Sequence, residues 1–175
     1  EYLGPILSKN VQAIVSDSDI LMEKIKQADL VVGAVLIPGK RAPHVVTEEH
    51  VTAMRDGAVI VDVSIDQGGC VWGSKATTHE DPIYTLKGKI YCSVANMPGQ
   101  VPRQSTQALT SATLPYLLKM ASMGSTALVR ESLAGNGAFA KGVNAYGGKI
   151  TYKSVAEDLG MMSDYEDLRN MPGMA

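Results

Sequence analysis

The sequence lacks a membrane-spanning segment, an excess of charge of either sign, and the cysteines of a disulfide-stabilised protein. Its longest apolar run, Leu30–Pro38, is far shorter than the about 20 residues that cross a bilayer. Lys and Arg number 16 and Asp and Glu 18, with no block of like charge that would suit a nucleic acid or an anionic membrane. Cys70 and Cys92 are too few for a disulfide framework. With no signal peptide at the start, these features fit a globular protein of the reducing cytoplasm.

Motifs of several common chemistries are also missing. The histidines His44, His50 and His79 are scattered, and with the cysteines they make no metal-binding spacing such as CxxC or HExxH. No GxSxG elbow surrounds Ser74. The segment Gly135–Ala140 formally matches GxGxxA, but it follows a helical pattern rather than a strand, so we interpret it as a turn between helices. The chain therefore has no pyrophosphate-binding loop of its own, and we expect no bound metal.

What the first hundred residues do contain is an alternation of β-type runs and helical patterns. The runs after the first are continuously apolar, as expected for strands that are buried on both faces of a parallel sheet. Ser16, Asp17 and Ser18 offer N-cap oxygens to one helix, and Thr47 caps a second. Alternation of this kind predicts an α/β fold with a partial Rossmann-type parallel sheet. The predicted strands are Val11–Val15, Asp29–Ile37, Gly57–Val63 and Lys89–Ala95.

The character of the chain changes near Pro98 and Gly99, where we place a domain boundary. Residues 1–98 would form the sheet domain, and residues 99–175 a helical segment too small for an independent core. Three helices are predicted there, the first with Pro115 as a kink and the last ending at Gly160. They cover Ser105–Ala121, Thr126–Ala134 and Lys153–Leu159.

Candidate site residues lie where the predicted strands end, because ligands of open parallel sheets bind beyond the carboxyl ends of the strands. The loops there span residues 16–18, 35–39, 65–69 and 95–98. Asp66 is followed by Gly68 and Gly69, which let the backbone approach a ligand closely. It reads equally well as a functional carboxylate or as an Asx-turn residue. Asp62 falls inside a strand, where a satisfied structural carboxylate is the favoured interpretation.

At these loops the sequence resembles the alanine dehydrogenases. Asp-Gln-Gly-Gly-Cys in combination with Val-Ala-Asn-Met-Pro-Gly is a specific match, and the resemblance covers nearly the whole chain, thinning after about residue 125. The related transhydrogenase α subunit is less similar in these loops. The matching stretches are residues 28–39, 59–70, 77–82, 91–103 and 109–117.

The resemblance implies an enzyme that oxidatively deaminates L-alanine to pyruvate and ammonia with NAD. It implies a Rossmann-type NAD domain, a substrate domain to which the final helices return, and a homo-oligomer, usually a hexamer. Asp66 matches the family's active-site aspartate, and Lys75 falls where some members carry a basic residue near the cofactor. Ser64 departs from the pattern, since alanine is common there. The positions that match cofactor contacts are Ser16, Val35, Leu36, Val63, Ser64, Ile65, Asp66, Lys75, Val94, Ala95, Asn96 and Met97.

Other parts of the family's machinery are not found in this sequence. The catalytic histidine, the substrate-binding arginine and lysine, the glycine-rich loop and the ribose-binding aspartate would all precede Glu1. Since the chain opens on Glu1 rather than Met, we expect that a segment precedes it or was removed. Two alternatives stay open: a catalytically inactive folding or assembly fragment, and a related transhydrogenase or amino-acid dehydrogenase subunit.

Overall fold

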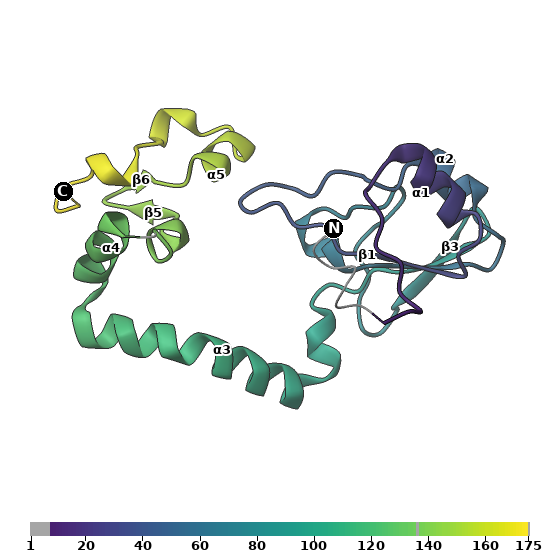
Figure 1. The fold of residues 1–175 in the computed structure, drawn as a ribbon, viewed down its shortest axis with the longest axis horizontal. Coiled ribbons are helices and arrows are strands. Elements are labelled where there is room, and N and C mark those ends of the chain that lie inside the picture. The colour runs from purple at the N-terminus through teal and green to yellow at the C-terminus, as the bar shows by residue number, and fades with distance from the viewer. Residues whose placement is uncertain (1–7, 136, 175) are drawn as a thin grey trace. The chain divides into compact units, whose positions relative to one another are not determined.

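The computed structural model describes residues 8–135 and 137–174. The predicted first domain begins at residue 1, so its first seven residues lie outside the described part. The chain divides into two compact units, whose elements are labelled in Figure 1. The first unit comprises residues up to 34 together with 44–65 and 69–94, and the second comprises 35–43, 66–68 and the residues from 95 onward. Among the described residues, no helix combines the length and apolarity needed to span a bilayer.

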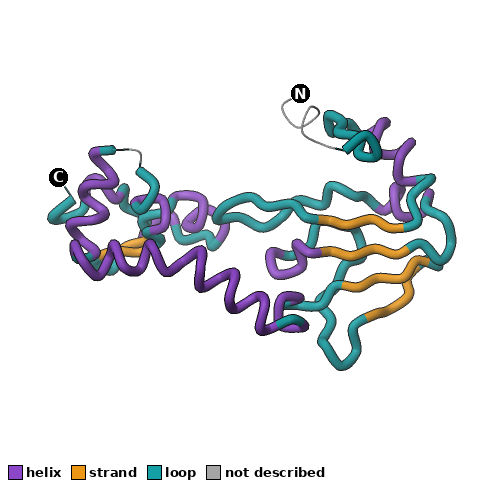
Figure 2. The backbone as a smooth tube through the Cα atoms, turned by 60° about the horizontal axis from the view of Figure 1, so that its bottom comes forward, coloured by secondary structure: helices purple, strands orange, loops and turns teal. Residues whose placement is uncertain are grey.

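The first unit is built on a four-stranded sheet with the order β1-β2-β4-β3, drawn in orange in Figure 2. Strands β1, β2 and β4 are parallel, so the predicted partial parallel sheet is confirmed. The register pairs Gly33 with Asp62 and Val61 with Cys92, which brings the carboxyl ends of all three strands to one edge. The strands are Leu30–Gly33, Val59–Asp62, Ile83–Leu86 and Lys89–Cys92, from β1 to β4.

One expectation for this unit is wrong, and one of its strands was not predicted. Residues 11–15 form no strand and are exposed, because a β-favouring run becomes a strand only beside a partner, and none of the described strands pairs with it. The connection from β2 to β4 contains no α-helix. It holds the 3₁₀-helix η2 (Val63–Gln67) and β3, which pairs antiparallel with β4. The two-residue turn Lys87-Gly88 has positive φ at both positions, 49° and 73°, the geometry that favours a tight hairpin.

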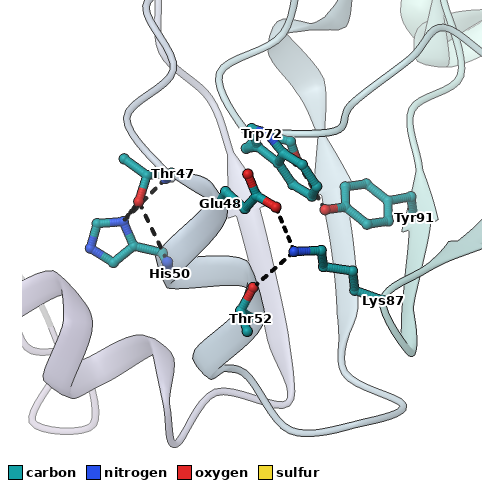
Figure 3. A network of polar contacts seen from close by, with 7 residues as sticks. All are labelled: Thr47, Glu48, His50, Thr52, Trp72, Lys87 and Tyr91. Atoms are coloured by element: carbon teal, nitrogen blue, oxygen red, sulfur yellow. Dashed lines mark hydrogen bonds and ion pairs between the residues drawn. The ribbon is translucent and has the colours of Figure 1, made fainter.

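Two short helices with side-chain caps belong to the first unit. Helix α1 (Ser18–Ile25) has Asp17 as its N-cap, and α2 (Glu48–Ala53) has Thr47, both as predicted. His50 completes a capping box, since its Nδ1 accepts the Thr47 backbone N–H at 3.1 Å (Figure 3). Its Nε2 lies 3.4 Å from the Ser18 carbonyl oxygen and so links α2 to α1. These contacts assign the proton to Nε2 and explain how a buried histidine is satisfied.

The second unit contains α3 (Pro102–Met123), α4 (Ser125–Ala134) and α5 (Lys153–Asp158), so its three predicted helices are confirmed. Helix α3 runs on through Pro115, and none of its side chains is buried. The chain turns after α4 into a 3₁₀-helix at Ala140–Gly142, which confirms that the GxGxxA match is not a strand-to-helix loop. A small core of Leu168, Met171 and Met174 packs against residues such as Val129 and Leu133.

A two-stranded hairpin in the second unit was not predicted. Strands β5 (Ala145–Tyr146) and β6 (Lys149–Ile150) pair antiparallel. They are joined by Gly147 and Gly148, both with positive φ. Strands of two residues carry no detectable alternation, so only the Gly-Gly pair signals this hairpin in the sequence.

The capping box yields a stability prediction. Replacing Thr47 by Ala removes the hydroxyl that accepts the His50 N–H and lies 2.9 Å from the ring, and should lower the free energy of unfolding by about 1 kcal/mol. Thr47→Ser keeps the hydroxyl and should stay close to wild type. Urea unfolding followed by circular dichroism measures both. Equal stability of Thr47→Ala and Thr47→Ser would contradict the capping role.

Candidate functional site

The carboxyl edge of the sheet is organised by Asp62, the last residue of β2. Its side chain is fully buried and accepts the backbone N–H groups of Ser64, Cys70 and Val71 at 3.1, 2.9 and 3.0 Å. The Cys70 Sγ lies 3.5 Å from Oδ1. This confirms the interpretation of Asp62 as a satisfied structural carboxylate, because each bond offsets part of the cost of its burial.

Two glycines allow the backbone to close around this carboxylate. A Cβ at Gly33 would stand 2.5 Å from the Cys70 sulfur, and a Cβ at Gly69 would stand 2.9 Å from Asp62 Oδ2. Gly69 also has φ +81°, a conformation that other residues rarely adopt. The loop from Asp62 to Val71 is therefore tightly closed at its base, while its tip carries Asp66 outward.

Asp66 differs from Asp62 in every respect that matters for chemistry. It lies in η2, and its side chain is exposed. Its carboxylate accepts no hydrogen bond from the described residues, so it does not form the hydrogen bond of an Asx-turn. It lines an open pocket of about 330 Å³ within the second unit. Gln67 lines the same pocket, and its Oε1 is buried with no hydrogen-bond partner in the described structure. The remaining lining residues are Gly39, Lys40, Arg41, Val155, Asp158 and Leu159.

One wall of the pocket is the segment after β1, which is fastened to α5. Gly39 has φ +73°, and a Cβ there would stand 2.7 Å from the Tyr152 ring. Lys40 Nζ lies 2.8 Å from Glu157 Oε2. The hydrogen bond within this ion pair raises the pKa of Lys40 above 10.5 and lowers the pKa of Glu157 below 4.5. Sequence reasoning missed this wall, because no local pattern joins residues 40 and 157.

The other predicted cofactor residues differ in how deeply the structure buries them. Ser64 and Ile65 are buried behind Asp62, and Val94 is buried where Thr77 bridges to it. Asn96 is exposed in a left-handed conformation with φ 54°. Ser16 is exposed before α1, and no hydrogen bond joins it to another of these residues in the described chain. Val35 and Met97 are half-buried, and the predicted residues that are exposed are Leu36, Val63 and Ala95.

Lys75 is the predicted residue whose surroundings are the most fully defined. Its Nζ lies 4.5 Å from the centre of the Tyr84 ring, and its backbone N–H donates to the Tyr84 hydroxyl at 3.0 Å. Sequence reasoning did not single out Tyr84. The only signal was its place in a run of β-favouring residues, which does not reveal which loop it meets.

A larger pocket, about 740 Å³, lies at α2 and the β3–β4 turn and not beyond the strand ends. Its lysine, Lys87, is already ion-paired with Glu48, and it faces the Trp72 ring (Figure 3). The cation of this pocket is thus neutralised by a neighbouring carboxylate, and we place the candidate site at the carboxyl edge.

A sheet with three parallel strands, accompanied by helices, defines the chain as an α/β protein. Residues 1–153 match the family described as Alanine dehydrogenase/PNT, C-terminal domain. The chain belongs to this family.

Proteins named alanine dehydrogenase are similar to the chain over most of its length. Alanine dehydrogenase of Halomonas elongata is 46% identical over 161 residues, which cover 92% of this chain and 42% of that protein. Alanine dehydrogenase of Lysinibacillus sphaericus is 48% identical, with 91% and 42% covered. The chain thus spans about two-fifths of the length of these relatives.

Solved structures resemble the chain in the same way. An L-alanine dehydrogenase superposes with a TM-score of 0.72 at 40% identity and covers 91% of this chain and 43% of its own. A transhydrogenase from Sinorhizobium meliloti superposes with a TM-score of 0.55 at 25% identity over 66% of this chain and 32% of its own.

The contrast between Asp62 and Asp66 predicts that their substitution by Asn lowers the free energy of unfolding to very different extents. Asp62→Asn places amide hydrogens against buried N–H groups and should cost about 3 kcal/mol of unfolding free energy. Asp66→Asn is a surface change and should stay within about 0.5 kcal/mol of wild type. Urea titrations of both variants measure the difference. A wild-type midpoint for Asp62→Asn would show that Asp62 does not hold the loop.

The Lys40–Glu157 pair predicts a pH window. Glu157 has a lowered pKa, so its contribution to stability is present above 4.5 and is lost as the pH falls through the lowered value. Lys40 has a raised pKa, so its contribution is present below 10.5 and is lost as the pH rises through the raised value. Thermal unfolding of wild type and Glu157→Gln should therefore differ only inside this window. A difference that does not shrink as the pH falls progressively below 4.5 would contradict the assignment.

Proposed function

We propose that the chain is the C-terminal part of an NAD-dependent alanine dehydrogenase, which oxidatively deaminates L-alanine to pyruvate and ammonia and runs the reverse reductive amination. Residues 1–98 would be the second half of the NAD-binding domain, and residues 99–175 would return to the substrate domain. The observation that carries the proposal is Asp66, an exposed carboxylate without a partner among the described residues, placed directly after β2 in a chain of this family.

Asp66 suits the charge that develops in this reaction. Loss of a hydride from the alanine Cα gives a cationic iminium group, which water then attacks. A carboxylate with no competing hydrogen bond can orient the substrate amine or this water, and it stabilises the developing positive charge. NAD, when bound, supplies the hydride acceptor.

Residues of each unit carry features that suit a dinucleotide. Leu36 in the second unit and Val63 in the first are large apolar side chains exposed by 66% and 48%, and an aromatic ring can pack on either of them. Gln67 Oε1 is a buried acceptor without a partner in the described structure, which suits an amide or hydroxyl donor. The proposed cofactor contacts are those that the resemblance implies, from Ser16 to Met97.

Protonation and binding of the substrate carboxylate would be the task of residues in the rest of the enzyme, which we propose to be a cytoplasmic homo-oligomer, a hexamer as in the family. The alternative of an inactive assembly fragment is favoured by one observation. Helix α3 has no buried side chain, and Leu117 and Leu118 are exposed by 57% and 61%. A helix of this kind needs contacts beyond those of the described chain.

The test is NADH consumption with pyruvate and ammonium, by the chain alone and after addition of the N-terminal part of an alanine dehydrogenase. We expect activity in the combined sample, and Asp66→Asn should lower turnover by about 100-fold or more while leaving NADH affinity nearly unchanged. Asp158→Asn, in the same pocket, is the matched control and should keep most of the activity.

Two outcomes would count against this function. Wild-type turnover in Asp66→Asn would remove the proposed catalytic role. A combined sample that binds NADH but never turns over would favour the assembly fragment.

A further inference from the structure

Tyr84 holds the segment that leads to Lys75 through its hydroxyl as well as its ring. The hydroxyl accepts the Lys75 N–H at 3.0 Å and donates to the Gly73 carbonyl oxygen at 2.8 Å. The face of the ring lies under the ammonium, 4.5 Å from Nζ to the ring centre. One side chain thus fixes both the backbone and the charged end of Lys75. A lysine on a loop without such a neighbour would have neither restraint.

Tyr84 is itself held rigidly. Its ring stacks on Tyr91 with centres 5.0 Å apart and planes 13° apart. Tyr91 is fully buried, and its hydroxyl donates to the Trp72 carbonyl oxygen at 2.9 Å. Burial raises the pKa of Tyr91 to about 12 and also raises that of Tyr84. Both hydroxyls therefore stay protonated, and the two tyrosines donate to the carbonyls of consecutive residues, Trp72 and Gly73.

The charge of Lys75 is left without a carboxylate. Three lysines follow Gly69 in the first unit, and two of them are paired: Lys87 with Glu48, and Lys89 with Asp56 at 2.9 Å. No carboxylate among the described residues lies within ion-pair distance of Lys75 Nζ. A cation that is oriented but not neutralised is suited to an anion from outside the chain.

The segment that carries Lys75 also reaches the carboxyl end of β4. Two residues beyond it, Thr77 forms a parallel bridge to Val94, and its N–H donates to the Ser93 carbonyl oxygen at 3.0 Å. Val94 opens the stretch proposed to contact the cofactor. All of these residues belong to the first unit.

We propose that Tyr84 is a positioning residue: it holds the Lys75 ammonium at the carboxyl end of β4, where the ammonium binds a phosphate of the nicotinamide dinucleotide. The proposal rests on the proposed function for the presence of a dinucleotide. It adds the group that Lys75 meets and the residue through which Lys75 is placed. Preorganisation of this kind lowers the entropy lost when the side chain binds.

A double-mutant cycle in the 175-residue chain tests the coupling, with NADH fluorescence as the readout. Lys75→Gln should weaken NADH binding by about tenfold, as expected for the loss of one charged contact. Tyr84→Leu should weaken it by about fivefold, and Tyr84→Phe, which keeps the ring and the stacking, by about twofold. In the Lys75→Gln background neither Tyr84 substitution should change the dissociation constant measurably.

Matched controls separate charge and folding from positioning. Lys26→Gln removes an exposed charge of the same unit, and it should bind NADH like wild type. Two further probes are inorganic pyrophosphate, whose binding should weaken in Lys75→Gln, and uncharged adenosine, whose binding should not. Circular dichroism verifies that each variant is folded, and Tyr84→Phe carries the test if Tyr84→Leu is not.

Three results would overturn the proposal. If the Tyr84 substitutions weaken NADH binding equally in both Lys75 backgrounds, Tyr84 is structural only. If Lys75→Gln binds NADH like wild type, Lys75 meets no phosphate, and the proposed function survives. If the wild-type chain binds no NADH even at millimolar concentration, both alone and with the N-terminal part of an alanine dehydrogenase added, the cofactor assignment of this chain fails and the positioning role fails with it.

Discussion

The buried carboxylate of Asp62 is the constraint on which the candidate site depends. A charged side chain removed from water costs several kcal/mol unless hydrogen bonds replace its hydration. Asp62 recovers them from three backbone N–H groups that belong to two separate parts of one loop, at Ser64 and at Cys70 and Val71. The loop that leaves β2 is therefore brought back to its own starting point. The two ends of this loop are held together at the sheet.

The same loop carries two acids in contrasting surroundings. Asp62 and Asp66 are four residues apart, yet one is buried with every oxygen engaged, and the other is exposed without a partner among the described residues. The end of the loop is fastened independently, because the hydroxyls of Tyr91 and Tyr84 donate hydrogen bonds to the carbonyl oxygens of Trp72 and Gly73. An acid in the middle of the loop can then be exposed at little cost to the stability of the fold, because the hydrogen bonds that stabilise the loop lie at its two ends.

Local signals carried most of what could be predicted. The caps Asp17 and Thr47 and the apolar strand runs act within a few residues of themselves, so they were visible in the sequence. The failures concerned the pairing of one segment with another, which the residues of a single segment do not reveal. The run at residues 11–15 has β propensity but no partner, and β3 exists because Lys87 and Gly88 turn it back onto β4. Similarly, Asp66 could be named from the loop and the family resemblance, whereas Tyr84 became visible only once the hairpin placed it under Lys75.

Burial is uneven over the chain, and this bears on where its function resides. The side chains around Asp62 and Tyr91 are fully enclosed, whereas α3 buries none of its side chains, and β1 leaves Leu30 and Val32 each 57% exposed beside an edge with one strand partner. Exposed apolar surface and an unpaired strand edge are stabilised by contact with further protein. The described chain spans about 42% of its relatives, so such contacts are available in a longer or assembled enzyme. Positioning of Lys75 is local to the enclosed part and needs none of them. Under the proposed function, turnover would also draw on groups from the rest of the enzyme, so we expect ligand binding and catalysis to separate in this chain.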